Sequence, residues 1–253
     1  MSLSLTNQHI DAVYVLSVKK FTDRITHIQN ELAKHHISFE FIFEYDLGSI
    51  DILLEKKIFG LDPSIEPPQR SLVLKHISAW EKCVVSKHRN ILVFEDDVIL
   101  HEFFNQEIDL VMKDIAKKDS SYLIFLGGAD TRVPKEYFLS KEKIIKNPIA
   151  TADGYITDYS ACQKRLAWLE SNQVRLPADH LLKDIDQQEK IIQYWSYKPL
   201  VQQGSVFGMF TSTLDGKRKF KSNSYNLLRY RIKIFTRRII PSIYYRLLNL
   251  LKR

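Results

Sequence analysis

The sequence predicts an α/β fold with a central mixed sheet, followed by basic amphipathic C-terminal helices. Two observations support this class. Short apolar runs of strand length alternate with longer segments in which apolar residues recur at helical spacing. The chain of 253 residues is also long enough for one large domain whose core needs no disulfide support.

The first half of the chain alternates strictly. Residues 11–17 are apolar and predict a strand, and residues 21–35 predict a helix because Ile25, Ile28 and Leu32 share one helical face. We then expect a strand at 39–43, a proline-containing loop at 61–69, a helix at 71–87, a strand at 91–100 and a helix at 103–117.

The second half begins with a strand at 122–126 that stops at Gly127 and Gly128. A glycine pair permits close approach of the backbone to a ligand. Ligands of open α/β sheets gather at the carboxyl ends of strands, so Asp46, just beyond 39–43, is a further candidate. Expected next are a loop with a hairpin at 129–148, an extended segment at 151–157, helices at 160–171 and from 177, and a strand at 191–197.

Three consecutive carboxylates, Glu95, Asp96 and Asp97, interrupt the apolar run 91–100. A carboxylate removed from water costs several kcal/mol, on the order of 3 or more, unless a cation or hydrogen-bond donor compensates it. Oxygen ligands suit Mg²⁺ or Mn²⁺, ions typical of enzymes that handle nucleotides. On a strand, Glu95 and Asp97 project to one face and Asp96 to the other. The alternative is a surface turn with solvated acids.

Charge divides the chain into two parts. Residues 216–253 contain 12 Lys and Arg and no Asp or Glu, which leaves 25 basic against 30 acidic residues in 1–215. We therefore expect an acidic domain at 1–215 and a basic tail at 216–253.

Cysteine usage and hydropathy indicate the compartment. Cys83 and Cys162 have no partners at metal-site spacing, so neither a disulfide framework nor a zinc site is expected. The N-terminus lacks a signal-peptide pattern, and no segment approaches the roughly 18 apolar residues of a membrane span. A cytoplasmic protein, soluble or peripheral, is expected.

The tail is amphipathic. Its apolar stripe is flanked by basic side chains, and Pro241 divides it into two predicted helices, which suit the surface of an anionic membrane. Four tyrosines fit interfacial positions. The stripe consists of Leu228, Ile232, Phe235 and Ile239, the flanking cations are Arg229, Lys233 and Arg237, and the tyrosines are Tyr225, Tyr230, Tyr244 and Tyr245. The alternatives are a helix packed on the body and a segment that binds nucleic acid, the latter disfavoured because no nucleic-acid module is present.

Several motifs together resemble the family 25 glycosyltransferases, which build bacterial lipooligosaccharide and whose relatives glycosylate collagen. They occur in the family's order across residues 11–212, and the Glu-Asp-Asp strand and the Pro-x-Asp-His element are the most specific. The motifs are Val13 to Ser17 with Asp23-Arg24, His76 with Trp80, Phe94 to Asp97, Gly154 to Thr157, Pro177 to His180, and Pro199 to Gln203 with Ser205.

The chain departs from the family pattern ahead of His76. Gln69 and Lys75 stand where the family usually has Glu and Ser, and Ser71 also lies in the altered stretch, so a contact supported there is lost or replaced. Asp153 stands where a His is often found, which leaves the acceptor side open.

The resemblance implies a GT-A fold and inverting transfer of a hexose, galactose before glucose, from a UDP-sugar. It implies Mn²⁺ or Mg²⁺ at Glu95, Asp97 and His180, and a catalytic base, Asp179 or else Asp153. Helix capping is the alternative for Asp179, and core packing is the alternative for His76. The residues expected to contact the donor nucleotide are Leu16, Ser17, Arg24, Asp46, His76, Glu95, Asp96 and Gln203.

The implied partners are a UDP-sugar, a lipooligosaccharide acceptor and an anionic membrane surface reached through 216–253, at the inner face of the bacterial inner membrane. Two alternatives stay open. One is a metal-dependent phosphodiesterase whose tail binds nucleic acid, and the other is an inert family member that retained the fold.

Overall fold

A seven-stranded mixed sheet forms the centre of the protein, in the order β2-β1-β3-β7-β5-β8-β6. The computed structural model describes residues 5–61, 63–118, 121–149, 151–196, 198–210 and 223–251. The strands of the sheet are β1 (Ala12–Leu16), β2 (Glu40–Ile42), β3 (Asn90–Glu95), β5 (Tyr122–Phe125), β6 (Ile144–Lys146), β7 (Gly154–Asp158) and β8 (Ile192–Ser196). The predicted α/β class with a mixed sheet is therefore confirmed.

Strand direction decides which loops meet. β1 is parallel to β2 and β3, and β5 is parallel to β8. β7 runs antiparallel to both of its neighbours, β3 and β5, with Phe94 opposite Gly154 and Phe125 opposite Tyr155. The start of β7 therefore lies at the same edge of the sheet as the ends of β3 and β5.

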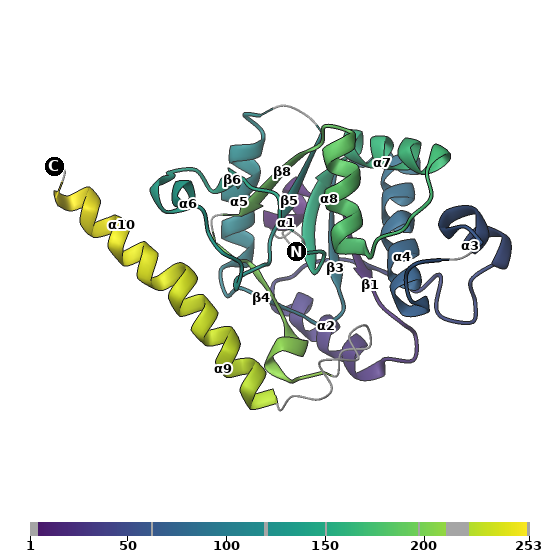
Figure 1. The fold of residues 1–253 in the computed structure, drawn as a ribbon, viewed down its shortest axis with the longest axis horizontal. Helices are drawn as coiled ribbons and strands as arrows, with labels where there is room; N and C mark the ends of the chain where they lie inside the picture. The colour runs from purple at the N-terminus through teal and green to yellow at the C-terminus, as the bar shows by residue number, and fades with distance from the viewer. Residues whose placement is uncertain are drawn as a thin grey trace.

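Helices cover both faces of the sheet (Figure 1). Apolar residues of β1, β3 and β7 alternate between two cores, as the period of a strand requires. One core includes residues of α3 (Ile52–Phe59), α4 (Pro67–Val85), α7 (Tyr159–Ser171) and α8 (Ala178–Gln188). The other includes residues of α2 (Thr22–Lys34) and α5 (Phe104–Ile115), with α1 (Leu5–His9) beside α5.

The acidic strand is shorter than expected. β3 ends at Glu95, Asp96 and Asp97 form a turn, and the chain resumes as β4 (Val98–Leu100), which pairs with β9 (Val201–Gln203) in a separate antiparallel sheet. The strand has thus ended before Asp96, so strand alternation does not apply to the two aspartates. Glu95 and Asp97 nevertheless line the same cavity, while Asp96 lines a neighbouring one. The segment 129–148 holds α6 (Lys135–Leu139) and β6 instead of a hairpin.

The C-terminal residues form one long helical arm along the side of the body, and its C-terminal end projects beyond the body (Figure 1). It comprises α9 (Asn223–Ile234), a π-helical turn (Phe235–Ile239) and α10 (Ile240–Leu251). Pro241 does not interrupt the arm; it lies just after the π-helical turn, where the chain departs from regular i→i−4 bonding. The predicted boundary at 215/216 lies outside the described residues. None of the helices in the described part of the chain combines the length and the apolar character that crossing a bilayer requires.

Candidate active site

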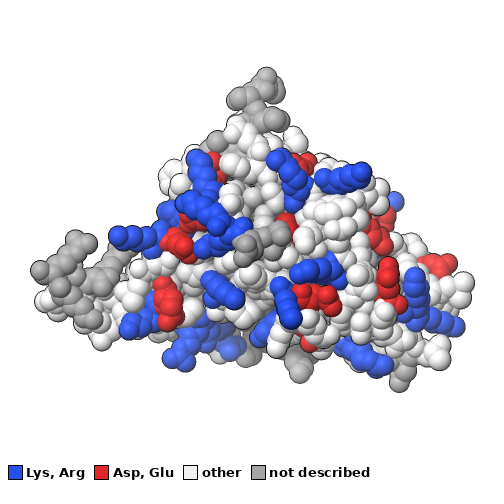
Figure 2. Space-filling model, turned by 90° about the horizontal axis from the view of Figure 1, so that it is seen from above, with Lys and Arg blue, Asp and Glu red and all other residues white. Residues whose placement is uncertain are grey.

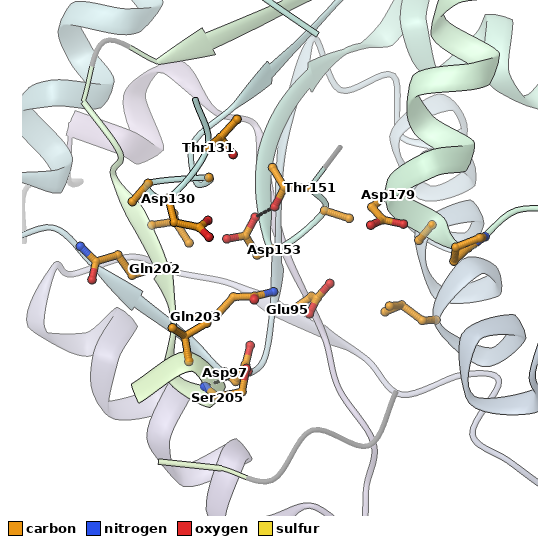
Figure 3. Close-up of a pocket in the computed structure, with 18 of the residues that line it drawn as sticks. Glu95, Asp97, Asp130, Thr131, Thr151, Asp153, Asp179, Gln202, Gln203 and Ser205 are labelled. Carbon is orange, nitrogen blue, oxygen red and sulfur yellow. Dashed lines mark hydrogen bonds between the residues drawn. The ribbon is translucent and has the colours of Figure 1, made fainter. Parts of the chain in front are cut away.

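A cavity of about 510 Å³ opens at the edge of the sheet where β3 and β5 end and β7 begins (Figure 3). Acidic side chains dominate its wall, and the first turns of α8, the end of β9, the 3₁₀ helix η1 (Gly204–Phe207) and α9 complete it. The polar residues that line it include Arg24, Gln69, Glu95, Asp97, Asp130, Thr131, Thr151, Asp153, Asp179, His180, Gln202, Gln203, Ser205 and Tyr230.

Main-chain pairing brings Glu95 and Asp153 together. The Glu95 amide donates to the carbonyl of Asp153 at 3.0 Å, which extends the β3–β7 ladder by one bond beyond Phe94 and Gly154. Because β7 runs the opposite way, a residue that precedes it lies beside one that ends β3. The two residues are 58 positions apart in the sequence, and only the sheet order makes them neighbours.

Two glycines make room for the carboxylate of Asp153 and the main-chain carbonyl of Asp97. A side chain at Gly127 would collide with the carboxylate of Asp153. A side chain at Gly204 would lie 2.9 Å from the carbonyl of Asp97, which accepts a bond of 2.6 Å from the Gly204 amide. The expected close approach at the glycine pair is thus made by Asp153, a part of the protein itself.

Burial and mutual repulsion raise the pKa values of Glu95 and Asp153. Desolvation, and then the charges of Asp97, Asp153 and Asp96, hold the pKa of Glu95 well above its ordinary value. Burial also raises the pKa of Asp153 to about 6, although Thr151 donates a hydrogen bond to its carboxylate. The carboxyl groups of Glu95, Asp97 and Asp153 are therefore crowded together, and the charge of Arg24 offsets their repulsion only in part.

Asp97 has an unsatisfied atom. Its Oδ2 accepts from the Ser205 amide at 3.3 Å, whereas Oδ1 is buried and has no hydrogen-bond partner among the described residues. A buried polar atom without a partner costs about 1–3 kcal/mol, which a cation would offset. In the described part of the chain no three His, Cys, Asp or Glu side chains form a ready-made metal site, so the ligand set Glu95, Asp97 and His180 stays a prediction.

A second cavity, of about 460 Å³, lies beside the first at the ends of β1 and β2. It is lined by residues predicted to contact the donor nucleotide, namely Leu16, Ser17, Asp46 and Asp96. Glu95 and Arg24 line both cavities.

The loop after β1 is tied down by Asp96. This carboxylate is buried and accepts from Ser17 Oγ and from Arg24 Nη1, each at 2.7 Å. Arg24, predicted to pair with a phosphate, is thus paired with Asp96 in this structure. Burial of Asp96 nevertheless raises its pKa, since desolvation outweighs the pairing with Arg24.

His76 lies in the core and lines neither of these cavities, so its assignment as a donor contact is corrected. His76 Nδ1 and Trp80 Nε1 both lie within hydrogen-bonding distance of the Tyr155 hydroxyl, at 2.9 and 3.1 Å. His76 and Trp80 therefore join α4 to β7, as the core-packing alternative predicted.

Asp179, His180 and Gln203 line the first cavity, as expected. Asp179 lies at the start of α8, on the side of the cavity away from Gln202 (Figure 3). Its Oδ1 accepts the amide of the next residue, His180, at 2.8 Å. Pro177, not Asp179, is the N-cap of α8, and no side-chain capping bond is present there, so the structure does not bear out helix capping as the role of Asp179.

Several lining residues were not anticipated. Asp130 and Thr131 follow Gly127 and Gly128, whose position at a strand end was the available signal. Tyr230 was expected at a membrane interface, yet it is buried and lines the cavity, because α9 packs against the body. Helical periodicity alone could not predict that Tyr230 lines the cavity.

The fold and site thus define a class: an α/β protein with an acidic, ligand-sized cavity at the carboxyl ends of its central strands. The model of glycosyltransferase family 25 (LPS biosynthesis protein) matches residues 10–182. The chain belongs to this family.

The chain is similar to curated members of the family. It is 28% identical to the lipooligosaccharide biosynthesis protein lic2B of Haemophilus influenzae over 180 residues, 67% of this chain and 66% of that protein. It is 30% identical to the inactive glycosyltransferase 25 family member 3 of Homo sapiens over 138 residues, 50% of this chain and 23% of that protein. The matches therefore cover just under two thirds of the bacterial relative and less than a quarter of the human one.

Proposed function

We propose that the protein is a metal-dependent, inverting glycosyltransferase of GT-A type. It would transfer a hexose, galactose before glucose, from a UDP-sugar to a lipooligosaccharide or lipopolysaccharide acceptor. The observation that carries the proposal is the convergence of Glu95, Asp97 and Asp153 at a cavity that adjoins a second one at the ends of β1 and β2. Family membership and the role of the Haemophilus relative in lipooligosaccharide biosynthesis support the reaction class and the acceptor.

The two cavities suit the two ends of a sugar nucleotide. The cavity with Leu16, Ser17 and Asp46 would take the nucleoside, since nucleotides bind at the carboxyl ends of strands in such sheets. Glu95 and Arg24 line both cavities, so the diphosphate would lie beside them, with Gln203 on the side of the sugar. The acidic first cavity would hold the transferred sugar and the acceptor.

Glu95 and Asp97 would hold Mn²⁺ or Mg²⁺, with His180 as a further ligand. Their oxygen donors, their crowded negative charge and the unpaired Oδ1 of Asp97 all fit a hard dication. When bound, the ion stabilises the negative charge that develops on the departing diphosphate.

Asp179 would accept the proton of the attacking acceptor hydroxyl, with Asp153 as the second candidate. Inversion requires a base on the face of the sugar opposite the leaving group. Asp179 fits because it is partly exposed to the cavity and stands at a different side from the Glu95 and Asp97 cluster (Figure 3).

The helical arm would hold the enzyme on an anionic membrane surface, the inner face of the bacterial inner membrane. Large apolar side chains stay exposed along both of its helices, and an amphipathic helix with such a stripe binds at the bilayer interface. The exposed residues include Leu228, Ile232, Phe235, Ile239, Ile243, Leu247 and Leu250. An acceptor anchored in a membrane would then be within reach of the cavity.

A nucleic-acid function is the weaker alternative. Basic and acidic side chains are interspersed over the face shown in Figure 2, which lacks the continuous basic surface that a phosphate backbone needs. Lys233, Arg237 and Arg238 of the arm are moreover bonded to the body.

Transfer from UDP-galactose and UDP-glucose to lipooligosaccharide, measured with Mn²⁺ and after chelation, tests the proposal. Asp97→Asn should lower kcat by about 100-fold or more, because the charge that positions the ion is lost. Asp184→Asn, on α8 outside the cavity, is the matched control. UDP binding without transfer would indicate an inert member, and undiminished transfer by Asp97→Asn would reject the metal assignment.

A further inference from the structure

The arm is fastened to the loop that borders the active-site cavity. Lys233 Nζ lies 2.5 Å from Asp130 Oδ2, Arg237 Nη1 donates to the carbonyl of Asp130 at 2.7 Å, and Arg238 Nε donates to the carbonyl of Ala129 at 2.9 Å. The cations expected to flank the apolar stripe thus include at least two, Lys233 and Arg237, that bind the body instead.

Arg238 is the strongest of these anchors. Its guanidinium stacks over the rings of Tyr137 and Trp195, 5.0 and 4.7 Å from their centroids, and Nη1 donates to the Tyr137 hydroxyl at 2.6 Å. Arginine between aromatic rings combines cation–π attraction with directional hydrogen bonds. The arm is therefore fixed relative to β8 and α6.

This attachment turns Tyr230 toward the cavity. Tyr230 precedes Lys233 by three residues and Arg237 by seven, so all three lie on the face of the helix that meets the body. Tyr230 is 9% exposed, its ring packs edge-on against Phe207 at 5.4 Å, and it lines the acidic cavity.

The position of Tyr230 separates it from the nucleotide. It lines the cavity with Asp153 and Asp179, and it is absent from the wall of the second cavity, where Ser17 and Asp46 lie. The nearby charges of Asp130 and Asp153 add to burial in keeping its phenol protonated, since both raise its pKa. A protonated phenol can donate a hydrogen bond to a hydroxyl or ether oxygen of a saccharide.

We propose that the arm forms one wall of the acceptor site and that the Tyr230 hydroxyl hydrogen-bonds to the acceptor saccharide. This inference rests on the proposed glycosyltransferase function. The opposite side of the same arm carries the exposed apolar stripe, so one helix would present the membrane surface on one side and the acceptor contact on the other. The family model ends at residue 182, and the arm lies beyond it.

Steady-state kinetics of the full-length chain with Tyr230→Phe test the proposal, using UDP-galactose and deacylated lipooligosaccharide core oligosaccharide. We expect the acceptor KM to rise about 5- to 10-fold, as the loss of one neutral hydrogen bond implies. The donor KM and the Kd of UDP should stay unchanged. The matched control is Tyr159→Phe, because Tyr159 lies at the start of α7, next to Arg89 and away from the cavity.

Arg238→Met provides a second variant, which should also raise the acceptor KM by moving the arm while UDP binding persists. An unchanged acceptor KM in Tyr230→Phe, or an equal rise in donor KM, would overturn the acceptor assignment. Saturation-transfer NMR with the UDP-loaded protein measures binding of the core oligosaccharide when no sugar can be transferred. A wild-type protein that binds this oligosaccharide through Tyr230 but transfers no sugar would refute the proposed function and leave the acceptor contact standing.

Discussion

Lys75, which is buried, forms an ion pair with the partly exposed Asp46, with Nζ 2.8 Å from Oδ1, at the edge of the cavity proposed for the nucleoside. Lys75 also donates to the carbonyl of Glu44, while Asp46 Oδ2 accepts the amide of Lys19 at 3.0 Å. The lysine that departs from the family pattern therefore joins the loops after β1 and β2. The contact expected to be lost or replaced at this position has a specific replacement.

Lys75→Met should weaken UDP binding about 10-fold, because it leaves Asp46 without its cation and loosens the loop at Lys19. Isothermal titration with UDP and Mn²⁺ measures this. Lys82→Met is the control, since Lys82 pairs with Glu40 at the surface, where an ion pair contributes little. Equal losses in both variants would contradict a specific role for Lys75.

Asp153→Asn should stabilise the fold while it lowers transfer. Burial raises the pKa of Asp153 to about 6 from its ordinary value of 3.8, so the ionised group opposes folding above that range. The penalty is absent below pH 3.8, grows between 3.8 and 6, and reaches about 3 kcal/mol at pH 7 by linkage. Urea unfolding at pH 7 and pH 4 should show the gain only at pH 7. A gain of equal size at both pH values would argue against this origin.

His76 should make the protein acid-sensitive. Burial lowers its pKa to about 3 from 6.5, so the unfolded chain binds a proton that the folded state refuses. Stability is thus lost as the pH falls below 6.5, by about 1.4 kcal/mol for each pH unit down to about 3. In His76→Gln the slope of unfolding free energy between pH 6.5 and 5 should be smaller by about one proton, and an unchanged slope would contradict this origin.

Arg165 and Asp186 form an ion pair without solvent exposure, closed by two bonds of 2.7 and 2.9 Å. Arg165→Met should cost about 3–5 kcal/mol, because it strands a buried carboxylate. The double variant Arg165→Met with Asp186→Leu should recover part of that loss. Chemical denaturation of both variants checks this, and Arg89→Met, at the exposed pair with Asp11, should change stability little. A double variant no more stable than the single one would contradict the argument.

Sedimentation with vesicles containing phosphatidylglycerol tests the arm. Replacing Ile243 and Leu247 with Ser should reduce binding about 10-fold or more, because each loses the apolar area that enters the interface. Leu53→Ser, at an exposed leucine of α3, is the control. Binding to duplex DNA but not to these vesicles would favour the nucleic-acid alternative.

Hydrophobic periodicity and the cost of burying charge are local properties, so the amino-acid sequence predicts the alternation of strands and helices and the position of the acidic triplet. The places of Asp46 and Glu95 at strand ends assign them to the site, whereas Ser17 is assigned through the motif resemblance. The sequence also placed Asp179 and Gln203 in the cavity through motif resemblance.

Only the tertiary structure decided how distant segments meet. The antiparallel direction of β7 brings Asp153 beside Glu95, and the packing of the arm turns Tyr230 into the cavity and commits Lys233 to Asp130. Periodicity reports which side of a helix is apolar, but a helix can be apolar on one side and anchored by polar bonds on another. Strand order and helix docking depend on contacts between residues far apart in the chain, which no local pattern encodes.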